Sequence, residues 1–152
     1  GPCIAKKVEA REHRETINYV LTFEEIMCML EGKDIKFAEM SGDTAYERDA
    51  SKLGLSFPLT AGVSAAVQDT VAAMGGEVHN AQYCSGLDKC RDTVKAAAEG
   101  KLDCSYIEGM ACSNGCIDGP AAVGDFHITK VALTKYAAAA PNKQAAEDKH
   151  TK

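Results

Sequence analysis

The chain has 152 residues, 45% of them hydrophobic, so it is long enough to bury one core and is about the size of one domain. Its net charge is −5, and no basic stripe interleaved with aromatic residues offers a surface for nucleic acid. No apolar run approaches the roughly 20 residues that span a bilayer, and no export signal opens the chain. We therefore expect a soluble, cytoplasmic protein that binds neither nucleic acid nor membrane.

The first predicted elements form a strand that leads into a helix. Residues 17–21 are rich in β-branched and aromatic side chains, which predicts a short buried strand. Thr22 and Glu25 form a capping box, apolar residues recur at helical spacing, and Gly32 ends the helix. Residues 39–58 lose this periodicity, so we predict an irregular, mobile loop there.

Strand and helix then alternate. We predict a helix over residues 62–74, ended by Gly75 and Gly76, a strand over 77–83, a helix over 86–99 and a strand over 102–107. The first of these helices carries most of its apolar residues on one face: Val63, Ala66, Val67, Thr70, Val71 and Met74. The alternation predicts an α/β fold, a mainly parallel sheet of about four strands covered by helices.

A last helix is predicted over residues 128–140, with Thr129 or Asp125 as its cap and Pro141 beyond it. Residues 141–152 are polar and charged, so we predict a disordered tail. The domain is therefore predicted to cover residues 1–140.

Seven cysteines are many for a chain without an export signal, and an odd number cannot all pair internally. In a reducing compartment such cysteines are buried apolar groups or thiolate ligands of soft metals and iron–sulfur clusters. We interpret Cys28 as a buried apolar group within its helix. Cys84, Cys90 and Cys104 lack the spacing of ferredoxins and are interpreted as core or partly exposed thiols.

The first chemical motif is Glu-Gly-Met-Ala-Cys-Ser-Asn-Gly-Cys at residues 108–116, which places Cys112 and Cys116 in a loop of small residues after an apolar strand. Small residues let backbone amides approach cluster sulfurs. The spacing alone leaves metal binding and two incidental thiols equally open, because zinc sites usually add a second ligand pair that this chain lacks.

The second motif is Pro-Cys-Ile-Ala-Lys-Lys-Val-Glu at residues 2–9, in which Lys6 and Glu9 follow Cys3. A nearby ammonium group stabilises a thiolate and can donate a hydrogen bond to an anionic metal ligand. Taken alone, the motif is better explained as a basic surface pair beside an incidental cysteine.

Together, the two motifs resemble those of the iron–iron hydrogenase large subunit, which read Met-Pro-Cys-x-x-Lys-Lys-x-Glu and Met-Ala-Cys-Pro-Gly-Gly-Cys. Residues 19–25 and 61–67 also resemble family segments, and the order and separation of all four agree. The similarity runs from residue 1 to about residue 119. It implies the C-terminal, cluster-binding lobe of the catalytic domain in that family.

The resemblance implies a role for each matching residue. Cys3 and Cys112 would be ligands of a 4Fe-4S cluster, and Cys116 would bridge it to a two-iron subcluster. Lys6 would contact a cyanide of the distal iron, Glu9 would lie on the route of proton transfer, and Met110 would line the pocket. The three cysteines should therefore converge at one edge of the sheet.

The chain departs from the family in three places. The Thr-Ser-Cys-Cys-Pro motif, which supplies a further ligand and the proton-donating cysteine, is absent; Gly1 replaces a pocket methionine; and Ser113-Asn114 replace Pro-Gly. Because the sequence starts inside a motif, we expect a C-terminal portion of a longer protein. Its expected partners are the missing N-terminal lobe, an electron carrier such as ferredoxin and a second copy of the chain.

Three functions remain open on the sequence. The parent protein is a hydrogenase that makes or splits H2, with this portion inactive alone; or it is a non-catalytic iron–sulfur module with a redox, regulatory or hydrogen-sensing role; or the domain is free of metal. The altered pocket residues favour the sensory role somewhat.

Overall fold

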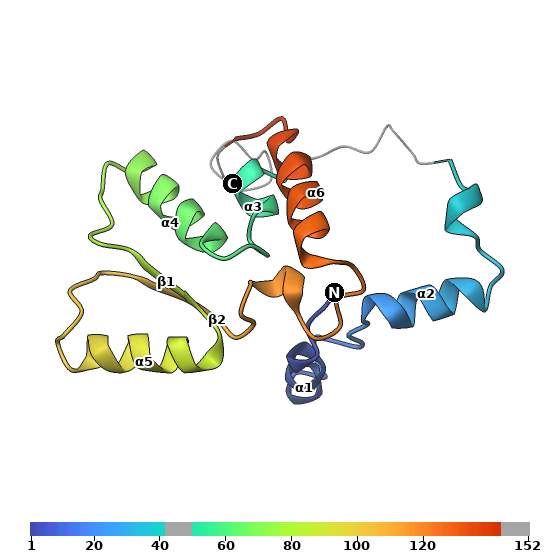
Figure 1. Cartoon of the computed structure of the whole chain (residues 1–152), viewed down its shortest axis with the longest axis horizontal. Coiled ribbons are helices and arrows are strands. Elements are labelled where there is room, and N and C mark those ends of the chain that lie inside the picture. Colours follow the sequence, from blue (N-terminus) through green and yellow to red (C-terminus); the bar gives the residue numbers. More distant parts are fainter. Residues whose placement is uncertain (42–49, 144–152) are drawn as a thin grey trace.

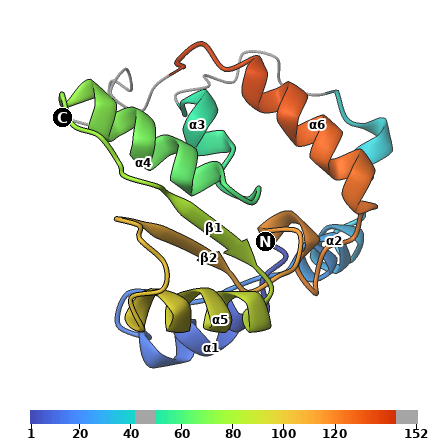
Figure 2. The ribbon, with the colours of Figure 1, turned by 60° about the vertical axis from the view of Figure 1, so that its left-hand side comes forward.

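The computed structural model describes residues 1–41 and 50–143. It has a mixed α/β fold around a parallel pair of strands, β1 (Gln82–Ser85) and β2 (Ile107–Met110), in which Gln82 pairs with Ile107 and Ser85 with Met110. Helix α5 (Leu87–Ala98) connects them, as a parallel pair requires. Figures 1 and 2 show α4 (Gly62–Ala73) on one face of this sheet and α5 on the other.

The sheet is smaller than the four strands that the sequence predicts. Residues 17–21 form no strand, because their backbone groups bond elsewhere. The Val20 carbonyl accepts a hydrogen bond from Lys7 Nζ at 3.0 Å, and the Leu21 carbonyl accepts one from the Gly1 nitrogen at 2.8 Å. The segment therefore lies against the N-terminal residues and has no neighbouring strand.

The two observed strands also start later than predicted. Asn80 has a φ of 45°, which ends any extended run before it, and its side-chain amide donates to the carbonyl of Asp103 at 2.5 Å. These contacts replace a regular ladder over residues 77–81 and 102–106. Pairing begins at Gln82, so residues 108–110, predicted as loop, belong to the strand.

The helices agree more closely with prediction. The capping box of α2 (Phe23–Glu31) is present, with Glu25 N donating to Thr22 Oγ1 at 3.2 Å and Thr22 N donating to the Glu25 carboxylate at 2.8 Å. Helix α6 (Phe126–Ala138) is capped by Asp125, one of the two predicted caps. The sequence analysis assigned no helix to α1 (Ala5–Glu12), which carries the second motif.

Short helical turns complete the fold. They are η1 (Phe37–Glu39), α3 (Lys52–Leu55) and η2 (Cys116–Asp118). The first two lie within the predicted loop, of which residues 42–49 fall outside the described residues. Residues 144–152 of the predicted tail also fall outside them, whereas Asn142 accepts a hydrogen bond from Lys52 N at 2.8 Å. Within the described residues, no helix is long and apolar enough to cross a membrane.

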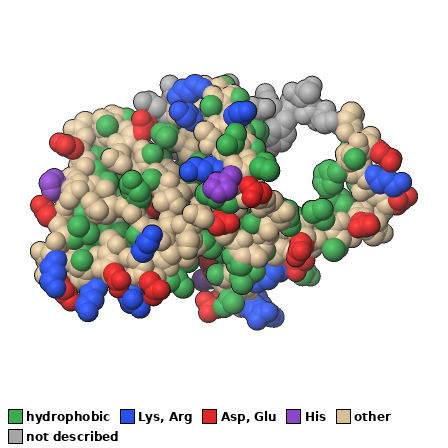
Figure 3. Space-filling model, viewed as in Figure 1, with side chains coloured by type: hydrophobic (Ala, Val, Ile, Leu, Met, Phe, Trp, Pro, Cys, Tyr) green, Lys and Arg blue, Asp and Glu red, His purple; other side chains and the backbone are tan. Residues whose placement is uncertain are grey.

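Helix α2 and η1 form an arm that extends away from the sheet and its helices (Figure 1). No residue of α2 is buried, and Phe23, Ile26, Met27 and Met29 are 37–59% exposed. Cys28, predicted to be buried, is likewise exposed, because no described part of the chain covers it. Figure 3 shows hydrophobic side chains along this arm.

A buried carboxylate joins the sheet to α4. Glu108, in the middle of β2, is 5% exposed, and it accepts hydrogen bonds from Ala61 N at 2.8 Å and Ser64 N at 2.5 Å. These amides begin α4, where the first N–H groups have no partner within the helix and the helix dipole favours a negative charge. Glu108 therefore caps α4 from the neighbouring strand.

We predict that Glu108→Ala lowers the free energy of unfolding by about 2–5 kcal/mol, because two buried amides lose their acceptor. Glu108→Gln should cost less, since one amide oxygen still accepts. Urea titrations followed by circular dichroism measure both changes. Glu31→Ala, at an exposed site, is the control and should stay within about 0.5 kcal/mol. Equal stability of all three variants would contradict the capping role.

Candidate metal-cluster site

The loop that carries Cys112 and Cys116 continues directly from β2 and is fixed against the segment before α4. Ile117 N donates to the carbonyl of Pro58 at 3.3 Å. At Gly115, φ is 86°, and an added Cβ would lie 2.7 Å from the Pro58 carbonyl oxygen and 2.9 Å from Thr60 N. Only glycine suits this combination of backbone angle and close approach.

The N-terminal residues lie beside the end of the same loop, as both ribbon views show (Figures 1 and 2). The Pro2 carbonyl accepts a hydrogen bond from Ala121 N at 3.1 Å, and an added Cβ at Gly119 would lie 2.6 Å from that carbonyl oxygen. This contact brings Cys3 to the loop of Cys112 and Cys116, although the two segments lie at opposite ends of the matched sequence.

The three cysteine thiols interact electrostatically. The pKa of Cys116 is raised, first because protein replaces water around part of the thiol, although the residue as a whole is exposed. Negative charge on Cys112 and then on Cys3 raises it further, whereas Lys6 acts in the opposite direction. Cys3 and Cys112 are half-buried. Cys116 is thus near enough to Cys112, Cys3 and Lys6 for their charges to interact.

Lys6 and Glu9 lie one turn apart on α1 and form an exposed ion pair. Their hydrogen bond raises the pKa of Lys6 and lowers the pKa of Glu9, and Cys3 and Cys116 add smaller raising effects on Lys6. The structure therefore brings Lys6, Glu9 and the thiols into one electrostatic group. Met110 is buried at the end of β2, two residues before Cys112.

A comparison with protein families identifies the family of the chain. The family model for the iron-only hydrogenase large subunit, C-terminal domain, matches residues 1–120. The chain belongs to this family. The match covers both motifs and confirms the resemblance found in the sequence. A search of curated proteins found no match.

The donor set suits the iron–sulfur chemistry of the iron-only hydrogenase family. Thiolates are the usual ligands of iron–sulfur clusters, and a lysine beside them favours their charged form. Within residues 1–41 and 50–143, no group of three or more His, Cys, Asp or Glu side chains is close enough to hold a single metal ion.

The residues that position the cysteines were not predicted from the sequence. Glu108 was read only as the start of the loop motif, although a charged residue between apolar neighbours in a strand was a usable signal. Gly115 and Gly119 were read as small residues near a cluster. The structure shows instead that they allow close backbone contacts with Pro58 and Pro2.

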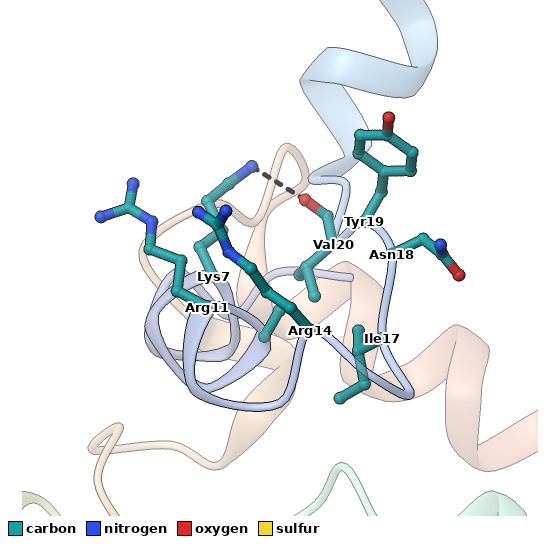
Figure 4. A pocket seen from close by; sticks show the side chains of 8 residues that line it. Lys7, Arg11, Arg14, Ile17, Asn18, Tyr19 and Val20 are labelled. Carbon is teal, nitrogen blue, oxygen red and sulfur yellow. Dashed lines mark hydrogen bonds between the residues drawn. The ribbon is translucent and has the colours of Figure 1, made fainter.

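A basic pocket of about 490 Å³ lies between α1 and residues 17–20 (Figure 4). Lys7 lines it and also bonds to the Glu25 carboxylate at 2.7 Å. Arg11 and Arg14 line it without a hydrogen bond or ion pair to any described residue, and none of its lining residues is acidic. The pocket therefore has a positively charged lining, with Arg11 on α1, the helix that carries Lys6, and Arg14 just beyond its end.

We predict that Gly119→Ala separates Cys3 from the cysteine loop, because the new methyl group would overlap the Pro2 carbonyl. The yield of cross-linking between Cys3 and Cys116 by a short bifunctional thiol reagent should fall severalfold, as measured by mass spectrometry. Gly1→Ala, whose methyl group meets nothing within 4 Å, is the control and should cross-link like the unchanged chain. Equal yields from both variants would show that Gly119 does not position Cys3.

Proposed function

We propose that the chain is the cluster-binding C-terminal part of a hydrogenase-like iron–sulfur protein, in which Cys3, Cys112 and Cys116 hold a 4Fe-4S cluster and a two-iron subcluster. The observation that carries the proposal is the electrostatic grouping of these thiols with Lys6 in a chain of the iron-only hydrogenase family. When bound, the iron cofactor supplies the redox chemistry that interconverts H2 with protons and electrons.

The protein's own residues hold the cofactor and handle charge and protons. Lys6 supplies a positive charge and an N–H donor toward anionic ligands of the metal. Glu9 holds the Lys6 ammonium through their ion pair and has a carboxylate that can take up and release a proton. Buried Met110 contributes apolar surroundings beside the cysteine loop, which tune a metal site through its polarity and its access to water.

A non-catalytic redox or regulatory module is the second candidate. The loop between the two cysteines carries Ser113 and Asn114, and the Asn114 amide donates to the Asp118 carboxylate at 2.8 Å. A polar, hydrogen-bonded loop gives the cluster different surroundings from the family's Pro-Gly sequence. Assaying H2 oxidation and proton reduction by the loaded parent protein distinguishes the two roles, since only the hydrogenase turns over.

We predict that Cys112→Ser and Cys116→Ser lose iron–sulfur assembly. After anaerobic reconstitution with iron and sulfide, bound iron should fall at least about tenfold, because even loss of a residue that only supports a metal ligand costs roughly 10–100-fold in affinity. Iron and sulfide assays with visible absorption measure this. Cys28→Ser is the matched control, since Cys28 is an exposed cysteine on α2. Equal iron content in all variants would refute the assignment of these ligands.

We further propose that another polypeptide surface covers the arm and the open side of the site, either the N-terminal lobe of the parent or a second copy of the chain. Apolar side chains are left open on two elements: on α2, where Phe23, Ile26, Met27 and Met29 are 37–59% exposed, and in a groove at α4 that Phe57, Val63, Val67 and Val71 line.

We predict that the purified chain associates with itself through the apolar face of α2. Light scattering after size-exclusion chromatography should give a mass above 16.1 kDa. Met27→Glu, at a side chain that is 54% exposed, should shift the chain toward the monomer by placing a charge in the interface. Glu24→Gln on the same helix is the control. A strictly monomeric chain with a full complement of iron would contradict both the association and the need for a second lobe.

An acidic electron carrier of the ferredoxin type is the proposed redox partner. The basic pocket supports this choice, because Arg11 and Arg14 can form bidentate bonds with carboxylates and lie on or just beyond the helix that carries Lys6. The cytoplasm is the proposed location, since thiolate ligands and free cysteines persist in a reducing compartment.

A further inference from the structure

Two cysteines outside the cluster site lie together on the other face of β2. Cys84 is in β1 and is 7% exposed, and Cys90 is one turn into α5 and is half-buried. Both sulfurs lie within 4.0 Å of the point where a Cβ at Gly109 would stand, Cys90 Sγ at 3.5 Å and Cys84 Sγ at 4.0 Å. The missing side chain at Gly109 therefore makes room for both sulfurs.

Both thiols bond to backbone carbonyls of the sheet. The Cys90 thiol donates to the carbonyl of Cys84 at 3.6 Å. The Cys84 thiol donates to the Glu108 carbonyl at 3.4 Å, and the Cys90 thiol donates to the Met110 carbonyl at 3.4 Å. Two thiols that share the space over Gly109, on elements joined by a short connection, are placed for a disulfide to form between them.

A small oxidant has a route to this pair. Cys84 lines a pocket of about 690 Å³ whose charged lining residues are Lys89, Lys130 and Asp92. The two ammonium groups outnumber the one carboxylate, so the pocket attracts an anionic low-molecular-weight disulfide, such as one that carries carboxylates. Cys84 is the thiol that meets the oxidant, because it lines this pocket, whereas Cys90 does not line it and acts in the second step. Burial is the main cause of the raised pKa of Cys90, which slows that step, because only its thiolate attacks.

We propose that Cys84 and Cys90 form a reversible disulfide by exchange with an anionic low-molecular-weight disulfide, a modification site separate from the proposed cluster ligands. The Cys84 thiolate attacks one sulfur of the reagent, forms a mixed disulfide and releases one thiolate. Cys90 then loses its proton and attacks the Cys84 sulfur, which releases the second thiolate. The protein gives up two protons and two electrons, and the reagent becomes two thiols.

The disulfide alters β2 through its carbonyl groups. Oxidation removes the S–H donors that now bond to the Glu108 and Met110 carbonyls. Each of the two carbonyls therefore loses one thiol donor, while the pairing of β1 with β2 and the hydrogen bond from Gly86 N to the Met110 carbonyl at 2.8 Å remain. The loop with Cys112 and Cys116 begins where β2 ends, at Met110. We therefore expect oxidation of the Cys84–Cys90 pair to alter the backbone hydrogen bonding next to the proposed ligands.

The test equilibrates the purified chain with mixtures of reduced and oxidised glutathione, blocks free thiols by alkylation and maps disulfides without reduction. Trypsin cuts after Lys89, so the disulfide joins peptide 53–89 to peptide 90–91. We expect this linked pair to dominate in oxidising mixtures and to vanish when reduced glutathione is restored. Alkylation of both cysteines in every mixture, or links to other cysteines in equal amounts, would overturn the proposal.

Two variants and a second measurement sharpen the test. Cys90→Ser keeps a donor toward the Met110 carbonyl and should stop at the mixed disulfide of Cys84 with glutathione, whereas Cys28→Ser should form the link normally. The mapping of the unchanged chain decides the matter even if Cys90→Ser fails to fold. Amide hydrogen exchange in β2 should rise severalfold on oxidation, and unchanged exchange would overturn the coupling to the cysteine loop.

Discussion

The described structure depends most on the bond between the Glu108 carboxylate and the first amides of α4. A buried charge is tolerated only where strong partners replace its water, and here two amides at a helix N-terminus do so. The bond requires the chain to turn sharply into α4, and Ala61 accordingly has a φ of 67°. Gly62 next to it has no room for a side chain, since a Cβ would lie 2.0 Å from the Ser56 carbonyl oxygen.

The segment around that turn also forms hydrogen bonds with β1 and with the cysteine loop. Thr60 Oγ1 and Ser85 Oγ are 2.7 Å apart and share a hydrogen bond at the end of β1. The carbonyl of Pro58 accepts a hydrogen bond from Ile117 N. Several contacts thus position Cys112 and Cys116. Fewer contacts position Cys3: they are mainly the hydrogen bond to the Pro2 carbonyl and the close packing of Gly119 against it. Of the three proposed ligands, Cys3 therefore depends most on a covering partner.

The features that could be predicted from the sequence are those determined by residues close together in the chain, such as helix caps. The capping box at Thr22 and the cap at Asp125 act within one helical turn, and both helices formed as expected. A strand needs a partner elsewhere in the chain, so the composition of residues 17–21 could not show that Lys7 would bind the Val20 carbonyl instead. The Glu108 bond escaped prediction for the same reason, since its partners lie 44 and 47 residues earlier.

For the site, the sequence supplied the motif cysteines, Lys6 and Glu9 only through resemblance to a family, because the spacing of either motif alone decided nothing. The structure adds the positioning contacts, which are mostly backbone to backbone and leave little trace in side-chain identity. Glycine is the exception, because its missing side chain marks a close approach. Gly115 and Gly119 could have been read in this way, but nothing in the sequence names the segments that approach them.

Strand β2 separates two kinds of thiol. Successive side chains point to opposite faces, so Glu108 reaches α4 while the open position at Gly109 receives the sulfurs of Cys84 and Cys90 from the side of α5. The cysteine loop then continues from the strand's end. A chemical change at the Cys84–Cys90 pair can reach that loop through the backbone of the strand and through the start of α5, where a Cβ at Gly86 would lie 3.6 Å from Ser113 Oγ. The Glu108 bond anchors the same strand on its other face, so we expect such a change to alter hydrogen bonding of the carbonyl groups while the fold is kept.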